Sequence, residues 1–139
     1  MSDGYVEAVK GTGDPMKPTI VLADDDQRFR SIVRSLLETD GYRILGEAAD
    51  AEGTIEAAAR HQPDVVVVDL VMDGSDGLST VEELLAADPA RPVIVISSLF
   101  DPIVEQDTVR LGAFYLEKVE GVEALEHAID MAASVSHRT

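Results

Sequence analysis

Residues 65–70 read Val-Val-Val-Val-Asp-Leu, four β-branched apolar residues followed directly by a carboxylate. A second run at 93–97, VIVIS, is apolar at its first four positions and ends in a serine. Strands that are apolar at every position are typical of a parallel sheet covered by helices on both faces. The two runs therefore predict central strands of an α/β fold.

Similar short runs recur along the chain and alternate with segments of helical periodicity. Besides the two central runs, strands are predicted at 20–23, 42–46 and 114–117. Apolar residues recur at helical spacing within 29–37, 55–59, 81–85, 103–111 and 122–131. This alternation predicts a doubly wound five-stranded parallel sheet, in which the functional crevice lies at the carboxyl ends of the strands.

Length and composition fit one domain with an aliphatic interior. The chain has 139 residues, of which 45% are hydrophobic and only 4% aromatic. Val, Ile, Leu and Ala must therefore build the core. Residues 1–17 are polar and rich in glycine, and we expect a flexible N-terminal arm there. The domain is predicted over 18–134, with a frayed tail at 135–139.

The charge balance excludes several classes of partner. With 27 acidic and 11 basic residues, the net charge of -16 repels nucleic acids and anionic membranes. The absence of cysteine excludes disulfides and Cys-based zinc sites. No apolar stretch approaches the roughly 18 residues of a membrane span, and residues 1–17 lack the apolar region of a signal peptide. We therefore expect a cytoplasmic protein that binds neither nucleic acid nor membrane directly.

Carboxylates follow two of the predicted strands. Asp24, Asp25 and Asp26 come after the first strand, and Asp69 ends the third. If these two strands are neighbours, the repulsion between Asp25 and Asp69 requires a compensating cation. Two or three carboxylates without His or Cys suit Mg²⁺. Asp26 is interpreted instead as the N-cap of the following helix.

Two further polar side chains follow the fourth and fifth strands, Ser97 and Lys118. A carboxylate such as Asp69, beside magnesium and a lysine, is a competent nucleophile toward phosphorus, because both cations offset charge on the phosphoryl group. Ser97 can donate a hydrogen bond to a phosphoryl oxygen, and Lys118 can pair with another. Each residue alone is a weak signal, but their convergence at one edge of a sheet is strong.

The motifs together resemble the receiver domain of two-component response regulators. They are 20–26 (IVLADDD), 65–77 (VVVVDLVMDGSDG), 92–98 (PVIVISS), and the pair formed by Gly112-Ala113 and Lys118. The similarity extends over about residues 18–134. It implies a flavodoxin-like (βα)5 fold with strand order 2-1-3-4-5. It also implies a phosphoprotein that receives its phosphoryl group from a sensor histidine kinase or a phosphotransfer protein and acts on a downstream protein target.

The resemblance implies a magnesium site with defined ligands. Asp69 would be the phosphoacceptor and, with Asp25, a ligand of Mg²⁺. Asp24 would hold the metal directly or through water. The backbone carbonyl of Val71 would be a further ligand.

The resemblance also implies a switch. Ser97 matches the family's switch hydroxyl, Tyr115 its switch aromatic residue and Lys118 its lysine. Phosphorylation would draw the hydroxyl inward and reorient the aromatic ring. The surface of the fourth helix, fifth strand and fifth helix would then change its contacts, and a homodimer through that surface is a further implication.

The sequence departs from the family pattern near the site. Asp73 stands where proline is usual. The interval 112–118 is one residue shorter than usual, which leaves open whether Tyr115 moves or is a static, partly buried residue. Val71 and Leu99 are apolar at the positions that flank the route of the hydrolytic water, so we expect slow self-dephosphorylation.

Two alternative functions stay open. A degenerate receiver would act as a docking scaffold without phosphorylation. A Mg²⁺-dependent aspartyl phosphatase would use Asp69 as its nucleophile, but haloacid-dehalogenase-type enzymes need a second Asp two residues later, where this chain has Val71. A phosphatase built on this chain would therefore lack the general acid that its catalytic cycle needs. We therefore predict a phosphoacceptor signalling domain rather than a turnover enzyme.

Overall fold

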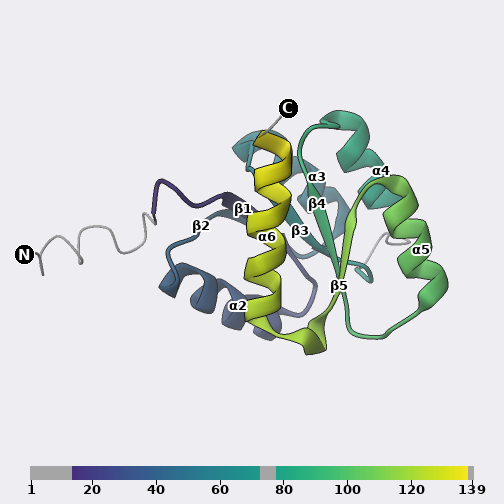
Figure 1. The fold of residues 1–139 in the computed structure, drawn as a ribbon, viewed down its shortest axis with the longest axis horizontal. Coiled ribbons are helices and arrows are strands. Elements are labelled where there is room, and N and C mark those ends of the chain that lie inside the picture. The colour runs from purple at the N-terminus through teal and green to yellow at the C-terminus, as the bar shows by residue number, and fades with distance from the viewer. Residues whose placement is uncertain (1–13, 73–77, 138–139) are drawn as a thin grey trace, which may run out of the picture.

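Five parallel strands organise the computed structural model, which describes residues 14–72 and 78–137 (Figure 1). The strands are β1 (Thr19–Ala23), β2 (Arg43–Ala48), β3 (Val65–Asp69), β4 (Val93–Ser97) and β5 (Phe114–Glu117). The helices are α2 (Gln27–Thr39), α3 (Ala51–His61), α4 (Leu78–Ala87), α5 (Pro102–Leu111), the short 3-10 helix η1 (Lys118–Glu120) and α6 (Val122–His137). Both apolar runs that predicted central strands are strands.

The strands pair in the order β2-β1-β3-β4-β5. The chain passes from β2 at one edge to β3 on the far side of β1, so the strand order reverses between β1 and β3. Ala23 of β1 is aligned with Val68 of β3. The residues that follow these two, Asp24 and Asp69, are therefore brought together at the carboxyl edge. The doubly wound sheet and its strand order are confirmed.

Helices cover both faces of the sheet and create two cores. On one face, α2 and α6 pack side chains such as Leu37 and Ile129 against Ile20 and Leu22 of β1. On the other face, α3 and α4 pack Ala58 and Leu84 against alternate residues of the same strands. All residues of β1, β3 and β4 are buried as a result. This is why these strands are apolar at nearly every position.

Short polar side chains begin the helices next to the sheet edge. The Oδ1 atom of Asp26 accepts the N–H groups of Arg28 and Phe29 at 3.1 Å each, which confirms Asp26 as the N-cap of α2. Asp101 caps α5 in the same way. At the other end of α5, Gly112 has φ +99°, a left-handed conformation that ends the helix at little steric cost.

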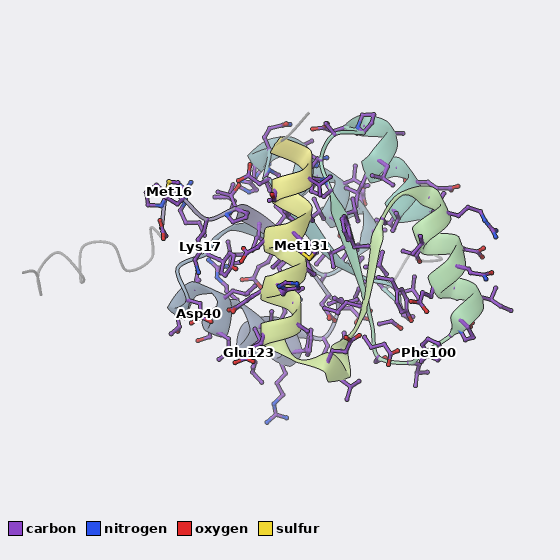
Figure 2. All side chains as sticks on the ribbon, viewed as in Figure 1. Met16, Lys17, Asp40, Phe100, Glu123 and Met131 are labelled. Atoms are coloured by element: carbon purple, nitrogen blue, oxygen red, sulfur yellow. The ribbon has the colours of Figure 1, made fainter. Side chains whose placement is uncertain are left out.

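The residues before β1 contact the rest of the domain, and α6 extends to the end of the described chain. The N–H of Asp14 donates to the carbonyl of Gly41 at 2.6 Å, and Lys17 Nζ donates to the carbonyl of Asp40 at 2.7 Å. Figure 2 shows Lys17 and Asp40 side by side near the end of α2. At the other terminus α6 continues to His137. Neither expected boundary, 17/18 or 134/135, coincides with a break in structure, and the division into arm, domain and tail stays a prediction.

Two further observations concern the bounds of the second strand and the character of the helices. The second strand was predicted at 42–46 but runs from Arg43 to Ala48, because Tyr42 lies in the turn with its N–H bonded to the carbonyl of Leu37. None of the helices within 14–72 and 78–137 has the length and apolar character that crossing a membrane requires.

Candidate functional site

Three carboxylates meet at the carboxyl ends of β1 and β3. Asp24 is fully buried and Asp69 is 6% exposed, whereas Asp25 is exposed. One oxygen from each carboxylate lies within 4.8 Å of the others. The expected approach of Asp25 to Asp69 is therefore confirmed. Its cause is the pairing of β1 with β3, which places the two strand ends side by side.

Asp24 is held at several of its polar atoms. Its N–H donates to the carbonyl of Ala48 at the end of β2, at 3.0 Å. Its Oδ1 accepts the N–H of Asp26 at 2.9 Å, and its Oδ2 lies 2.7 Å from Lys118 Nζ. These contacts hold the backbone and both carboxylate oxygens of Asp24 in place next to Asp25 and Asp69.

Lys118 supplies the compensating charge. Its Nζ lies 2.7 Å from Asp24 Oδ2 and 3.4 Å from Asp69 Oδ2. The same ammonium lies 4.2 Å from the centroid of the Phe29 ring, an additional favourable cation–π contact. The Lys118 side chain is only 15% exposed, so it is oriented before any ligand arrives. The structure thus brings the predicted lysine to the predicted carboxylates.

Negative charge exceeds positive charge at this site. Burial and the neighbouring Asp24 carboxylate raise the pKa of Asp69 to about 6, although the Val71 N–H and Lys118 oppose the shift. Burial lowers the pKa of Lys118, but its contacts with Asp24 and Asp69 outweigh burial and leave that pKa raised. A further cation would offset the remaining repulsion. The donor set, all carboxylate oxygens with one side open to solvent, fits Mg²⁺.

Ser97 and Tyr115 contact the same backbone carbonyl. Ser97 Oγ donates to the carbonyl of Leu99 at 2.7 Å, and the Tyr115 hydroxyl donates to that carbonyl at 3.3 Å. Ser97 ends β4 and Tyr115 lies within β5, so the Leu99 carbonyl links side chains of two adjacent strands. Tyr115 is half-buried. The switch roles of Ser97 and Tyr115 stay predictions.

Three further residues were expected near the site, Val71, Leu99 and Asp73. Val71 is 70% exposed, and its N–H donates to Asp69 Oδ1 at 3.2 Å. The role of its carbonyl as a metal ligand stays a prediction. Leu99 is 78% exposed. Asp73, the expected extra carboxylate, lies outside the described residues.

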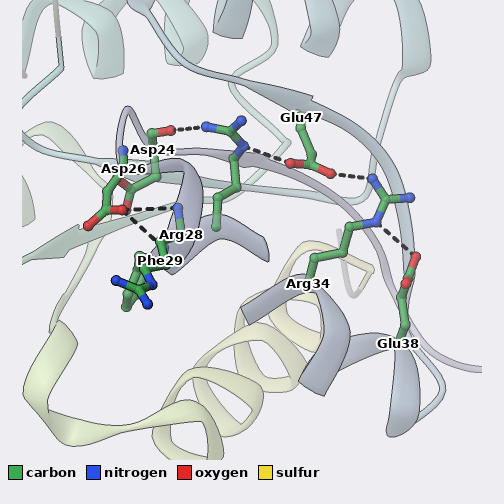
Figure 3. Close-up of polar contacts among 8 residues, drawn as sticks. Asp24, Asp26, Arg28, Phe29, Arg34, Glu38 and Glu47 are labelled. Atoms are coloured by element: carbon green, nitrogen blue, oxygen red, sulfur yellow. Dashed lines mark hydrogen bonds and ion pairs between the residues drawn. The ribbon is translucent and has the colours of Figure 1, made fainter. Parts of the chain in front are cut away.

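A network of ion pairs next to residues 24–26, which we call the acidic loop, was not predicted from the sequence. Arg30 of α2 donates through Nη1 to the backbone carbonyl of Asp24, and through Nε to Glu47 Oε1 at 2.6 Å. Arg34 also pairs with Glu47, and with Glu38 at 3.0 Å (Figure 3). The available signal was weak: Arg30 follows Asp26 by one helical turn, but the partner strand that supplies Glu47 cannot be known from spacing.

Comparison with known proteins gives a consistent result. The family model of the response regulator receiver domain matches residues 20–130. The transcriptional regulatory protein PdtaR of Mycobacterium tuberculosis is 30% identical over 116 residues, which cover 83% of this chain and 56% of PdtaR. Protein CcdB of Bacillus subtilis is 32% identical over 111 residues, which cover 78% of this chain and 92% of CcdB. The chain thus spans little more than half of PdtaR but nearly all of CcdB.

Solved structures agree with this match. The signal receiver domain of NarL from Mycobacterium tuberculosis has a TM-score of 0.78 at 28% identity, and the alignment covers 86% of this chain and 98% of that domain. A CheY-like receiver domain protein from Methanospirillum hungatei has a TM-score of 0.81 and covers 88% of this chain. Because its identity is only 18%, that second likeness concerns the fold alone.

Proposed function

The chain belongs to the response regulator receiver domain family, and from that premise we propose that it accepts a phosphoryl group on Asp69 in a Mg²⁺-dependent reaction. The observation that carries the proposal is the meeting of Asp24, Asp25 and Asp69 with the Lys118 ammonium at one edge of the sheet. These are the groups that phosphoryl transfer to a carboxylate requires: a nucleophile and cations that offset developing charge.

The proposed step is a displacement at phosphorus. An oxygen of Asp69 attacks the phosphorus atom of a phosphohistidine, an O–P bond forms, and the P–N bond breaks with its electron pair returning to the imidazole nitrogen. Lys118 lies 3.4 Å from Asp69 Oδ2 and pairs with a phosphoryl oxygen as charge shifts toward the new acyl phosphate. Ser97 ends the adjacent strand and can donate its hydroxyl to another oxygen once it releases the Leu99 carbonyl.

The carboxylates of Asp25 and Asp69 would hold the metal, with Asp24 bound directly or through water and the Val71 carbonyl as a further ligand. Bound Mg²⁺ would neutralise charge on the phosphoryl oxygens and on the carboxylates. The raised pKa of Asp69 is consistent with this assignment, because burial and the neighbouring Asp24 carboxylate both disfavour its charged form and a bound cation would offset them.

The signalling consequence follows from the link between Ser97 and Tyr115. A phosphoryl group that recruits the Ser97 hydroxyl would withdraw it from the Leu99 carbonyl, which Tyr115 also contacts. The surface formed by α5, β5 and α6 would then change its protein contacts. A sensor histidine kinase or phosphotransfer protein as donor, a downstream protein target, a homodimer through this surface and a cytoplasmic location stay predictions.

A labelling experiment tests the proposal. The protein is incubated with Mg²⁺ and a small phosphodonor such as acetyl phosphate, and its intact mass is measured. We expect one base-labile phosphoryl group per chain that is lost in Asp69→Asn and after chelation of the metal. The Asp26→Asn variant, which changes a helix cap instead of the site, is the matched control and should be labelled normally.

The same experiment separates the alternatives. Continuous release of phosphate without stoichiometric labelling would indicate a phosphatase. Failure to label the wild-type chain at all would overturn the proposal and favour a phosphorylation-independent docking scaffold. Within residues 14–72 and 78–137 no specific contact favours a second function, and the position of Val71 two residues after Asp69 argues against the phosphatase.

A further inference from the structure

We propose that Arg30, held by Glu47, is a positioning residue that fixes the acidic loop for metal binding. The inference rests on the proposed function, because the magnesium site is part of it. The described bonds of Arg30 go to Glu47 and to the Asp24 backbone, and none of them goes to the three carboxylates of the site. Arg30 acts through the backbone carbonyl of Asp24, to which its guanidinium donates.

The contact with a carbonyl determines the orientation of a peptide group. The Asp24 carbonyl belongs to the peptide that leads into Asp25, so a donor that holds this oxygen also sets the direction in which the Asp25 side chain leaves the backbone. The other polar atoms of Asp24 are held by Ala48, Asp26 and Lys118. Arg30 completes this set, and its side chain is only 14% exposed.

Glu47 orients Arg30 in turn. Glu47 lies in β2 and accepts Arg30 Nε at 2.6 Å through Oε1, and its Oε2 accepts Arg34 Nη1. Burial raises the pKa of Glu47, but the hydrogen bonds from Arg34 and Arg30 outweigh it and leave that pKa below its ordinary value. Glu47 is therefore ionised at neutral pH. A planar guanidinium can make both contacts of Arg30 at once, which a single ammonium does less well.

Arg34 provides a matched control. It lies one helical turn after Arg30, pairs with the same Glu47 and carries the same charge, but its described bonds go to Glu47 and Glu38 and not to the acidic loop. Figure 3 shows Arg34 on the far side of Glu47 from Asp24. Arg34→Gln therefore removes a charge and an ion pair while leaving the carbonyl contact of Arg30 in place.

The sign of the expected effect separates positioning from charge. Removing either arginine makes the surroundings of the site more negative, which by Coulomb attraction alone would tighten Mg²⁺ binding. Loss of the positioning contact would instead weaken Mg²⁺ binding. Arg30→Gln should therefore weaken Mg²⁺ binding, on the order of 10-fold, whereas Arg34→Gln should leave binding unchanged or slightly tighter.

The test compares wild type, Arg30→Gln, Arg30→Lys and Arg34→Gln in the full chain. The Kd of Mg²⁺ is measured by calorimetry at constant ionic strength, and hydrogen exchange of the Asp24 amide is measured in metal-free protein. We expect a raised Kd and faster Asp24 exchange in Arg30→Gln, intermediate values in Arg30→Lys, and no increase of either quantity in Arg34→Gln. Thermal unfolding of all four proteins with a chelator confirms that the variants are folded.

Each outcome decides one of the two proposals. If Arg30→Gln and Arg34→Gln behave alike in both Mg²⁺ affinity and Asp24 exchange, Arg30 has no positioning role and the inference is overturned. If wild-type protein binds no Mg²⁺, the metal step of the proposed function fails. In that case faster Asp24 exchange confined to Arg30→Gln still supports positioning of the loop, and equal exchange in the two glutamine variants overturns it.

Discussion

At the scale of single residues, Val71 contributes both a backbone donor to the site and an exposed apolar side chain two residues after Asp69. Its N–H holds Asp69 Oδ1 at 3.2 Å, while its side chain, 70% exposed, presents no group that can bind water. Hydrolysis of an acyl phosphate needs a water molecule placed in line with the O–P bond. An apolar side chain two residues from Asp69 favours a long-lived phosphoryl group.

Val71→Asn should therefore shorten the lifetime of phosphorylated Asp69 several-fold, because the amide can hydrogen-bond an attacking water. The lifetime is measured by following the mass of the labelled chain after removal of the phosphodonor. Val119→Asn is the control, since Val119 follows β5 and is also highly exposed, at 85%. Equal lifetimes for wild type and Val71→Asn would contradict this account.

At the scale of elements, β4 and β5 are joined beyond their backbone ladder by the Leu99 carbonyl. That carbonyl accepts Ser97 Oγ at 2.7 Å and the Tyr115 hydroxyl at 3.3 Å. The two hydroxyls share one acceptor, so a change in one hydrogen bond affects the other. If the Ser97 hydroxyl withdraws, the Leu99 carbonyl is left to the Tyr115 hydroxyl. This contact gives the proposed switch a physical route from the phosphorylation site to the α5–β5–α6 surface.

Tyr115→Phe tests this route. The variant keeps the ring but loses the hydroxyl, at a cost of about 1 kcal/mol in the free energy of unfolding. We expect Asp69 to be labelled as in wild type, while the phosphorylation-induced changes in amide NMR shifts along β5 and α6 become smaller. Tyr42→Phe, which removes a hydroxyl bonded to Asp130 away from the site, is the control. Unaltered shift changes in Tyr115→Phe would mean that Tyr115 is static.

At the scale of the whole molecule, excess negative charge weakens the folded state, and the acidic site concentrates part of that excess. The chain carries a net charge of -16. Folding buries Asp69 and places it beside Asp24, and together these raise the pKa of Asp69 from an ordinary 3.8 to about 6. Folding therefore favours the protonated form of Asp69, and the metal-free protein should be sensitive to pH.

The stabilising contribution of protonated Asp69 is complete below about pH 4 and is lost as the pH rises through about 6. Over that range, metal-free wild type should lose on the order of 2 to 3 kcal/mol of stability relative to Asp69→Asn. The measurement is urea unfolding of both proteins at a series of pH values with a chelator present. Parallel pH profiles would show that Asp69 titrates normally.

Local sequence patterns alone predicted the buried strands, two of the residues at their ends and one helix cap. The β-branched runs at 65–70 and 93–97 predicted buried parallel strands, because only a sheet covered on both faces tolerates apolar residues at successive positions. The same runs located Asp69 and Ser97 at strand ends. Asp26 was predicted as a helix cap, since capping depends on residues within one turn. The strand order was available only through resemblance to a family.

Only the tertiary structure decided which distant side chains meet. The Lys118 ammonium lies nearer to Asp24 than to Asp69 and makes a cation–π contact with Phe29. Glu47 of β2 forms an ion pair with Arg30 of α2. These contacts depend on strand register and on side-chain rotamers, which a one-dimensional pattern does not contain. Apolar periodicity and caps are encoded within a few neighbouring residues, whereas the ion pairs around the acidic loop exist only once β1, β2 and β3 are aligned.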